Sequence, residues 1–221
     1  MPNAPLPEWE KLLASAAHLQ KIVPDAVLVG GTAAATFAHH RVSVGHDHTV
    51  IDLKARFDDV LATLESVAGW KTARVKRPVL ILGSLDGIET GIRQLIREEP
   101  LETEVVEVGG VALRVPTQAE MLRIKAVLIV KRNATRDYLD FVALSELIGR
   151  DATLLALESF DRLYPQANGQ SVRQQLQVQL ANPLPYDLEE TNLREYKKLK
   201  PEYQDWSVVA EKCREIANVL W

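Results

Sequence analysis

A single stretch early in the chain combines an apolar run, two glycines and a cluster of polar residues. Ala26–Val29 is apolar throughout, which predicts a buried strand. Gly30-Gly31-Thr32 predicts a turn, and Ala33–Ala38 is small and compatible with a helix. Val42–Val44 predicts a second strand that ends in Gly45-His46-Asp47-His48. Because a glycine-rich turn at the start of a helix exposes backbone N–H groups, this order predicts a turn that holds a phosphate.

The composition is that of a globular protein and excludes few classes of function. Hydrophobic residues make up 47% of the 221 residues, which is ordinary for a chain with a proper core. The single Cys213 excludes an intrachain disulfide and a cysteine zinc cluster, and it fits a reducing compartment. The sequence shows no signal-peptide pattern and no run as long as a membrane span, so we expect a cytoplasmic protein without a membrane partner. The net charge of −4 leaves a local nucleic-acid-binding patch possible.

The residues up to Pro116 predict a small mixed sheet flanked by helices. Amphipathic spacing predicts helices at Leu6–Val23 and Asp52–Trp70. The remaining predicted elements are one or two strands in Lys71–Leu82, a turn at Ser84–Gly87, a strand at Ile88–Leu95, and a hairpin of Thr103–Val108 and Val111–Val115 around Gly109-Gly110.

After Pro116 the pattern is helical throughout. Thr117 is placed to cap a helix over Gln118–Val130, with Glu120 as its capping-box partner. We therefore predict an α/β (α+β) fold with two domains, an α/β domain at 1–116 and a helical C-terminal domain at 117–221 that contributes to the active-site cleft. The further predicted helices are Asn133–Leu147, Ala152–Leu163, Ser171–Leu180, Asn192–Leu199 and Trp206–Leu220.

Two groups of motifs resemble the nucleotidyltransferases of AbiEii type, whose usual form is Gly-Gly-Thr-Ala followed by Arg-x-Ser-x-Asp-x-Asp. The first group is Gly30-Gly31-Thr32-Ala33 with His40-Arg41-Val42-Ser43 and Gly45-His46-Asp47-His48. The second is Lys125, Lys131-Arg132-Asn133 and Arg136-Asp137-Tyr138-Leu139-Asp140, which is similar to the family's helical motif. The family comprises toxins of bacterial toxin–antitoxin systems within the polymerase-β-like nucleotidyltransferase superfamily. The resemblance implies Mg²⁺ as cofactor, NTP as co-substrate, an RNA acceptor such as tRNA, and a cognate antitoxin.

The resemblance also implies roles for individual residues. Nucleotidyl transfer needs positioning and charge neutralisation, and carboxylates two apart on a strand share one face, where they can bridge magnesium ions. Asp47 and Glu89 would bind the metal, with Asp86 in reserve for Glu89, and Lys125 would complete the catalytic set. Phosphate binding is assigned to Gly30, Gly31, Thr32, Ser43, Lys125 and Arg132, and supporting roles to Arg41, His46, His48, Arg136, Asp137 and Asp140.

The sequence departs from the family pattern at Gly45, where the first metal-binding Asp is expected. Losing one member of a catalytic unit commonly lowers activity by orders of magnitude. Three interpretations are open: a weakened enzyme, a catalytically silent module that binds a nucleotide or a partner, and a variant altered to silence a toxic activity.

Bland interpretations compete with the remaining assignments. On a strand, His46 and His48 share one face, but a transition-metal site there lacks a clear third ligand, so we favour cleft-edge or nucleotide contacts. Lys125 lies on an otherwise apolar helix, where an amine is costly unless it is paired, and an ion pair with Asp137 or Asp140 is compatible with a phosphate role. The charged residues from 132 to 140 can equally form a solvated, salt-bridged helix face.

Overall fold

The computed structural model describes residues 8–220. The chain divides into two compact units, which are described separately. The first contains the described residues up to Thr36 together with Ser43–Pro116. The second contains Phe37–Val42 and the described residues from Thr117 onward. Among residues 8–220, no helix has both the length and the apolar character needed to span a membrane.

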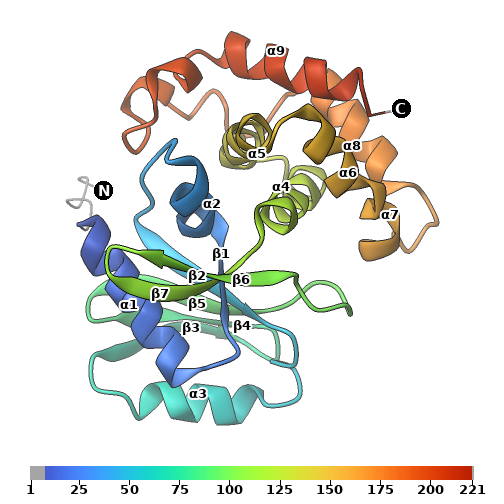
Figure 1. Cartoon of the computed structure of the whole chain (residues 1–221). Coiled ribbons are helices and arrows are strands. Elements are labelled where there is room, and N and C mark those ends of the chain that lie inside the picture. The colour runs from blue at the N-terminus through green and yellow to red at the C-terminus, as the bar shows by residue number, and fades with distance from the viewer. Residues whose placement is uncertain (1–7, 221) are drawn as a thin grey trace. The chain divides into compact units, whose positions relative to one another are not determined.

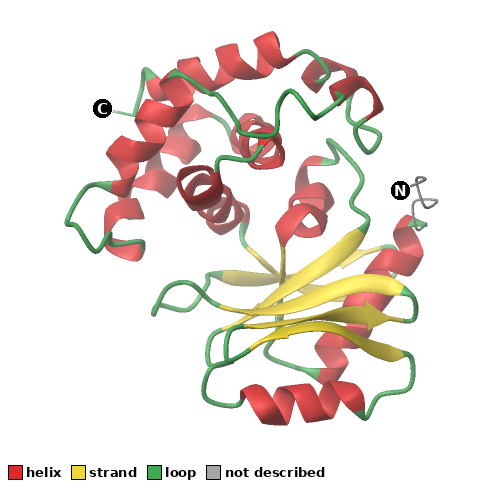
Figure 2. Ribbon diagram, turned by 180° about the vertical axis from the view of Figure 1, so that it is seen from behind, coloured by secondary structure: helices red, strands yellow, loops and turns green. Residues whose placement is uncertain are grey.

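The first unit is built on a five-stranded mixed sheet with the strand order β1-β2-β5-β4-β3 (Figures 1 and 2). The β2–β5 pair is parallel and the other pairs are antiparallel. A separate hairpin, β6–β7, turns at Gly109-Gly110 as predicted. The strands are β1 (Val27–Val29), β2 (Gly45–Val50), β3 (Trp70–Lys76), β4 (Leu80–Leu85), β5 (Ile88–Gln94), β6 (Thr103–Val108) and β7 (Val111–Pro116).

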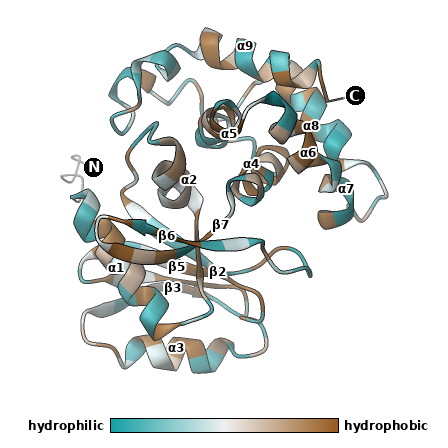
Figure 3. Ribbon diagram, in the orientation of Figure 1, coloured by the Kyte–Doolittle hydropathy of each residue, from teal (hydrophilic) through white to brown (hydrophobic). Residues whose placement is uncertain are grey.

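Helices α1 (Trp9–Ile22) and α3 (Phe57–Glu65) supply apolar side chains to one face of this sheet. Hydrophobic and hydrophilic residues alternate along α3 in Figure 3, in keeping with one buried and one solvated side. The resulting core joins these helices to alternate residues of the strands, among them Val50, Ile81 and Ile92. Because strand residues alternate between faces, the other face of the sheet carries Asp47, Glu89 and their neighbours.

The second unit is a helical bundle, so the predicted fold class, a mixed sheet followed by a helical region, is confirmed. Helix α4 begins at Thr117, whose side chain accepts a hydrogen bond from the Glu120 N–H, and it ends at Asn133 in the left-handed conformation. The helices are α4 (Gln118–Arg132), α5 (Thr135–Ile148), α6 (Arg150–Glu158), α7 (Phe160–Leu163), α8 (Val172–Ala181) and α9 (Trp206–Ala217), with short 3₁₀ turns at η1 (Leu193–Glu195) and η2 (Pro201–Tyr203).

Two predictions around the glycine-rich stretch are wrong in detail. Helix α2 (Gly30–Ala38) begins at Gly30, so the glycines form its first turn and not a separate turn before it. The predicted strand Val42–Val44 is a loop, and Gly45-His46-Asp47-His48 forms the strand itself. The Val42 N–H donates to the Lys197 carbonyl instead of to a neighbouring strand, which explains why this apolar run does not join the sheet.

The observed bounds of several other elements differ from the predicted ones. Residues 52–56 form a turn before α3, held by the pair between Asp52 and Arg56. Strand β4 continues to Leu85, and the turn is Asp86-Gly87, both with positive φ. The helix predicted over residues 192–199 shrinks to η1, because two following lysines adopt positive φ. Residues 152–163 are divided between α6 and α7, and the predicted start of the first helix at Leu6 lies outside the described residues.

Candidate functional site

The Asp47 carboxylate lies beside the first residue of α2. A Cβ added to Gly30 would be 3.4 Å from Asp47 Oδ2, and one added to Gly91 would be 3.1 Å from Asp47 Oδ1. Glycine at position 91 therefore leaves room for the carboxylate, whereas a Cβ at position 30 would make an ordinary van der Waals contact with it. The first N–H groups of a helix have no partner within the helix and carry partial positive charge. The strand–helix junction thus places an acidic side chain next to an N-terminus suited to phosphate.

Arg93 is the near cationic partner of Asp47. Its Nε atom is 3.5 Å from Asp47 Oδ1, and the two side chains are 49% and 46% exposed, so solvent reaches the pair. Arg93 is not among the site residues predicted from the sequence. The signal was available, because Glu89, Gly91 and Arg93 alternate along one strand and must share a face. This half-exposed arginine, next to the carboxylate at the α2 N-terminus, adds positive charge where an anion would bind.

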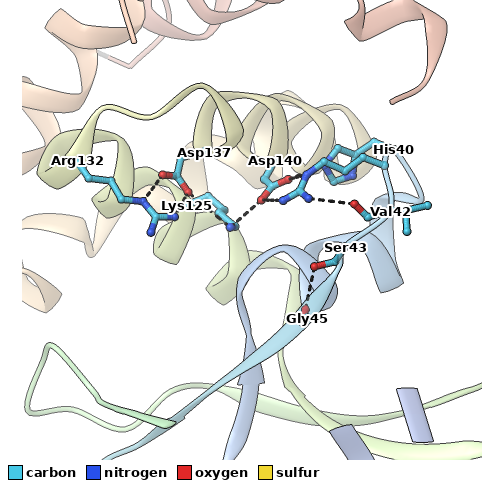
Figure 4. Close-up of polar contacts among 9 residues, drawn as sticks. His40, Val42, Ser43, Gly45, Lys125, Arg132, Asp137 and Asp140 are labelled. Carbon is cyan, nitrogen blue, oxygen red and sulfur yellow. Dashed lines mark hydrogen bonds and ion pairs between the residues drawn. The ribbon is translucent and has the colours of Figure 1, made fainter. Parts of the chain in front are cut away.

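Gly45 has no room for a side chain. A Cβ added there would be 2.5 Å from the Glu89 carbonyl oxygen and 3.1 Å from the Glu89 Cβ. The Gly45 carbonyl accepts hydrogen bonds from the Thr32 hydroxyl at 2.7 Å and the Ser43 hydroxyl at 2.9 Å, the latter drawn in Figure 4. The predicted phosphate ligands Thr32 and Ser43 thus fix the start of β2.

Glu89 shares the face of Asp47. In the parallel pair, Glu89 is opposite Gly45 and Gly91 is opposite Asp47, so Glu89 is displaced from Asp47 by one strand across the sheet and two residues along it. Glu89 is exposed. Asp86 instead lies in the β4–β5 turn, where its carboxylate contacts His18 Nδ1 at 3.3 Å. Within the described part of the chain, no group of three or more His, Cys, Asp and Glu side chains is arranged to hold a metal ion.

His46 and His48 lie on the opposite, core-side face of β2. The His46 ring contacts the Ser15 hydroxyl at 3.0 Å and the Thr90 hydroxyl at 2.9 Å. The His48 ring packs edge-on against the His46 ring, with the two ring centroids 5.2 Å apart, and neither of its ring nitrogens has a hydrogen-bond partner in the described structure. Burial lowers the pKa of His46 to about 4 and that of His48 well below its usual value. Both rings are therefore neutral parts of the core and are not at the edge of a cleft.

These two histidines predict a loss of stability in mild acid. Their folded-state pKa values lie below the ordinary value of 6.5, so the unfolded chain binds more protons as pH falls. The free energy of unfolding therefore keeps its full value above pH 6.5 and decreases as the pH falls toward 4. For His46 the decrease is on the order of 1.4 kcal/mol for each unit by which its pKa is lowered. We expect urea-unfolding midpoints to drop over this range, and His46→Gln to flatten the drop. An equal slope in the variant would contradict this assignment.

Asp140 is the centre of a buried charged cluster in the second unit (Figure 4). Its carboxylate accepts two hydrogen bonds from Arg41, at 2.7 and 2.9 Å, and contacts Lys125 Nζ at 2.7 Å and His40 Nε2 at 2.7 Å. The side chains of Asp140 and Lys125 are 0% and 1% exposed. The ion pair considered for Lys125 as an alternative is therefore present, and the cluster joins Asp140 to His40 and Arg41, which lie far from it in the sequence.

Asp137 extends the cluster by one turn of α5. Arg132 contacts both of its carboxylate oxygens, and Lys125 Nζ is 3.6 Å away. The solvated-face interpretation is thus wrong for Asp137 and Asp140, which are fully buried, while Arg136 on the same helix is exposed. The structure brings together Arg41, Lys125, Arg132, Asp137 and Asp140 and leaves Arg136 outside.

The electrostatic environment of the cluster keeps Asp140 ionised. Burial would raise the pKa of Asp140, but the nearby Arg41 and Lys125 outweigh this and hold it well below its usual range. Burial lowers the pKa of His40, in spite of its hydrogen bond to Asp140. Asp140 therefore remains ionised, and it compensates two buried cations.

Comparison with solved structures identifies the fold. The antibiotic-resistance factor ANT(2'')-Ia matches with a TM-score of 0.51 and 11% identity, covering 69% of this chain and 91% of that one. The chain has the nucleotidyltransferase fold. An antigenic nucleotidyltransferase-like protein from Paracoccidioides brasiliensis also matches, with a TM-score of 0.47, 14% identity, and coverage of 72% and 90%. At such identities the likeness concerns the fold alone, and the narrower AbiEii resemblance stays a prediction.

Sequence comparison gives a different set of relatives. No protein-family model matches the chain. The heme uptake protein MmpL11 of Mycobacterium tuberculosis (strain ATCC 25618 / H37Rv) is 30% identical over 240 residues, covering 98% of this chain and 23% of that protein. The mycolic acid-containing lipids exporter MmpL11 of Mycolicibacterium smegmatis is 34% identical over 128 residues, covering 56% and 13%. The chain thus spans less than a quarter of these curated relatives.

Proposed function

We propose that this nucleotidyltransferase-fold chain binds a nucleoside triphosphate at the N-terminus of α2 and is catalytically silent in transfer. The observation that carries the proposal is the Asp47 carboxylate beside Gly30, next to a sheet position, Gly45, that has no room for a second carboxylate. The helix N-terminus and Arg93 supply positive charge for phosphate groups. The site keeps the means of binding, while the paired carboxylates needed for transfer are incomplete.

The residues present fit one magnesium ion better than two. Mg²⁺ is commonly held by one or two protein carboxylates, with phosphate oxygens and water completing its shell. Asp47 and Glu89 share the face on which a nucleotide would bring such an ion. When bound, the ion would neutralise phosphate charge. A two-metal arrangement needs carboxylates that bridge both ions, and Gly45 cannot contribute one.

A second candidate is the active transferase that the family resemblance implies, a toxin that moves a nucleoside monophosphate from NTP to RNA such as tRNA. The position of Glu89 favours it, because an exposed carboxylate on the face of Asp47 is what the third catalytic acid requires. A cognate antitoxin belongs to this candidate alone.

Calorimetric titration with ATP, GTP, CTP and UTP, with and without Mg²⁺, tests the binding site. We expect Gly31→Glu, at the second position of α2, to weaken NTP binding at least about tenfold, because a carboxylate replaces attraction at the helix N-terminus by repulsion. Ala62→Glu adds the same charge at an exposed position of α3 and serves as the control. Wild-type protein that binds no NTP, or a Gly31→Glu protein that is folded and binds normally, would overturn the proposal.

Incubation with radiolabelled NTP, Mg²⁺ and total tRNA separates the two candidates. The silent module leaves the RNA unlabelled although it binds NTP. RNA labelling that disappears in Asp47→Asn would instead establish the transferase.

A further inference from the structure

A row of basic side chains follows the free edge of the five-stranded sheet. Strand β3 is the last strand in the order β1-β2-β5-β4-β3 and carries Lys71, Arg74 and Lys76. We call these three residues the β3 stripe. The side chains of all three residues are exposed to solvent.

The register places the β3 stripe on the face that carries Asp47. Lys71 is opposite Ser84, which is opposite Glu89. Directly opposed residues point to the same side of a sheet, so Lys71 shares the face of Glu89. The same steps connect Arg74 through Leu82 and Gly91 to Asp47, and Lys76 through Leu80 to Arg93. The irregularity between Thr72 and Arg74 is what returns the later cations to this face after Lys71.

This face is accessible from the β3 stripe to Asp47. Of the residues between them, Leu80, Leu82 and Ser84 of β4 are partly exposed, Glu89 and Arg93 of β5 are exposed, and Gly91 is buried. Adjacent strands are about 4.8 Å apart, so Arg74 is about 14 Å from Asp47 across three strand spacings. A nucleic-acid strand lying along β3 would therefore pass about 14 Å from Asp47, on the same face of the sheet.

The stripe is not committed to internal ion pairs. The neighbouring Arg77 pairs with Asp58 of α3, whereas the three side chains of the β3 stripe make no ion pair or side-chain hydrogen bond within residues 8–220. Three exposed and unpaired cations on one strand have no stabilising role in the fold that the contacts reveal. Charge complementarity therefore points to an extended anionic partner.

We propose that the β3 stripe binds the phosphate backbone of a single RNA strand, which lies along the sheet edge on the face that carries Asp47. A nucleic-acid strand carries a regular series of phosphates, and lysine and arginine side chains on a line neutralise successive members of such a series. The inference uses the face identified in the proposed function, but it requires neither bound NTP nor transfer. It names the class of acceptor or ligand that this face can hold.

Fluorescence anisotropy with a labelled single-stranded RNA oligonucleotide tests the stripe. We expect the triple variant Lys71→Ala/Arg74→Ala/Lys76→Ala to bind the RNA at least about tenfold more weakly, and the slope of log K against log salt to fall by about two, at about 0.7 per lost contact. The control Lys21→Ala/Lys54→Ala/Lys131→Ala removes the same charge from exposed lysines elsewhere and is expected to retain both the affinity and the slope.

The outcomes separate this proposal from the nucleotide site. A triple variant that loses RNA but keeps NTP binding supports the β3 stripe, and Gly31→Glu is expected to show the reverse. Equal RNA loss in the triple variant and its control would show a general charge effect and overturn the proposal. It is overturned as well if wild-type protein binds NTP but no RNA, or if polyaspartate, which carries charge but no phosphates, competes as effectively as unlabelled RNA.

Discussion

Asp140→Asn is expected to lower the free energy of unfolding by about 3–5 kcal/mol, because it leaves buried cations without compensation. The Asp140 carboxylate is shared by Arg41, Lys125 and His40, and asparagine keeps its approximate shape while removing the charge. Urea-unfolding curves near pH 7 measure the change, and a shifted midpoint with an unchanged slope identifies it as a loss of stability.

The matched control lies on the same helix. Arg136→Ala removes an exposed charge from α5 and is expected to change stability by no more than about 0.5 kcal/mol. Combining Asp140→Asn with Lys125→Met should cost less than the sum of the single changes, because the second substitution removes one of the orphaned cations. If the two changes in the free energy of unfolding are strictly additive, or if the Asp140→Asn protein is as stable as wild type, the charged cluster does not stabilise the second unit.

The same cluster changes the meaning of the family motif. Lys125 is matched by position to a residue expected to neutralise phosphate, yet its side chain is 1% exposed and its amine is 2.7 Å from the Asp140 carboxylate. This ion pair favours a structural role for Lys125, in which it helps to hold together α4, α5 and the 37–42 segment. Under the proposed function, the motif residues therefore divide between two tasks: phosphate binding near Asp47 and internal charge pairing around Asp140.

Local chemistry made much of the fold predictable. Gly109-Gly110 supplies the positive φ values that a tight hairpin needs, so β6 and β7 were predicted with nearly their observed bounds. Thr117 caps α4 through the Glu120 N–H, as its spacing from that residue suggested. The alternation along residues 46–48 correctly separated the histidines from Asp47, because strand side chains point to opposite faces in turn.

Long-range contacts explain what the sequence did not reveal. Whether residues 42–44 or 45–50 form the strand depends on pairing with β1 and β5, not on the apolar run itself. The partners of Arg41 and His40 lie ninety-nine and one hundred residues away, and no spacing rule predicts them. The closeness of Gly45 to the Glu89 carbonyl likewise arises only when two distant strands adopt their register.

Gly45→Asp, which recreates the family motif, is expected to destabilise the protein and to produce no transfer activity. The new Cβ would be 2.5 Å from the Glu89 carbonyl oxygen, so β2 and β5 must move apart. Overpacking of this kind typically costs about 1–3 kcal/mol, and like charge beside Glu89 adds to the cost. Urea unfolding and the tRNA-labelling assay measure the two effects.

Gly45→Ala separates the steric effect from the effect of charge. We expect it to lose most of the stability that Gly45→Asp loses, because the Cβ alone makes the close contact. Ala73→Asp adds a carboxylate at an exposed position of β3 and should be nearly neutral. If Gly45→Asp is instead as stable as wild type and labels tRNA, the site lacks only a carboxylate. The chain would then be an inactivated transferase, and not a silent module in which the packing of β2 against β5 excludes a side chain at position 45.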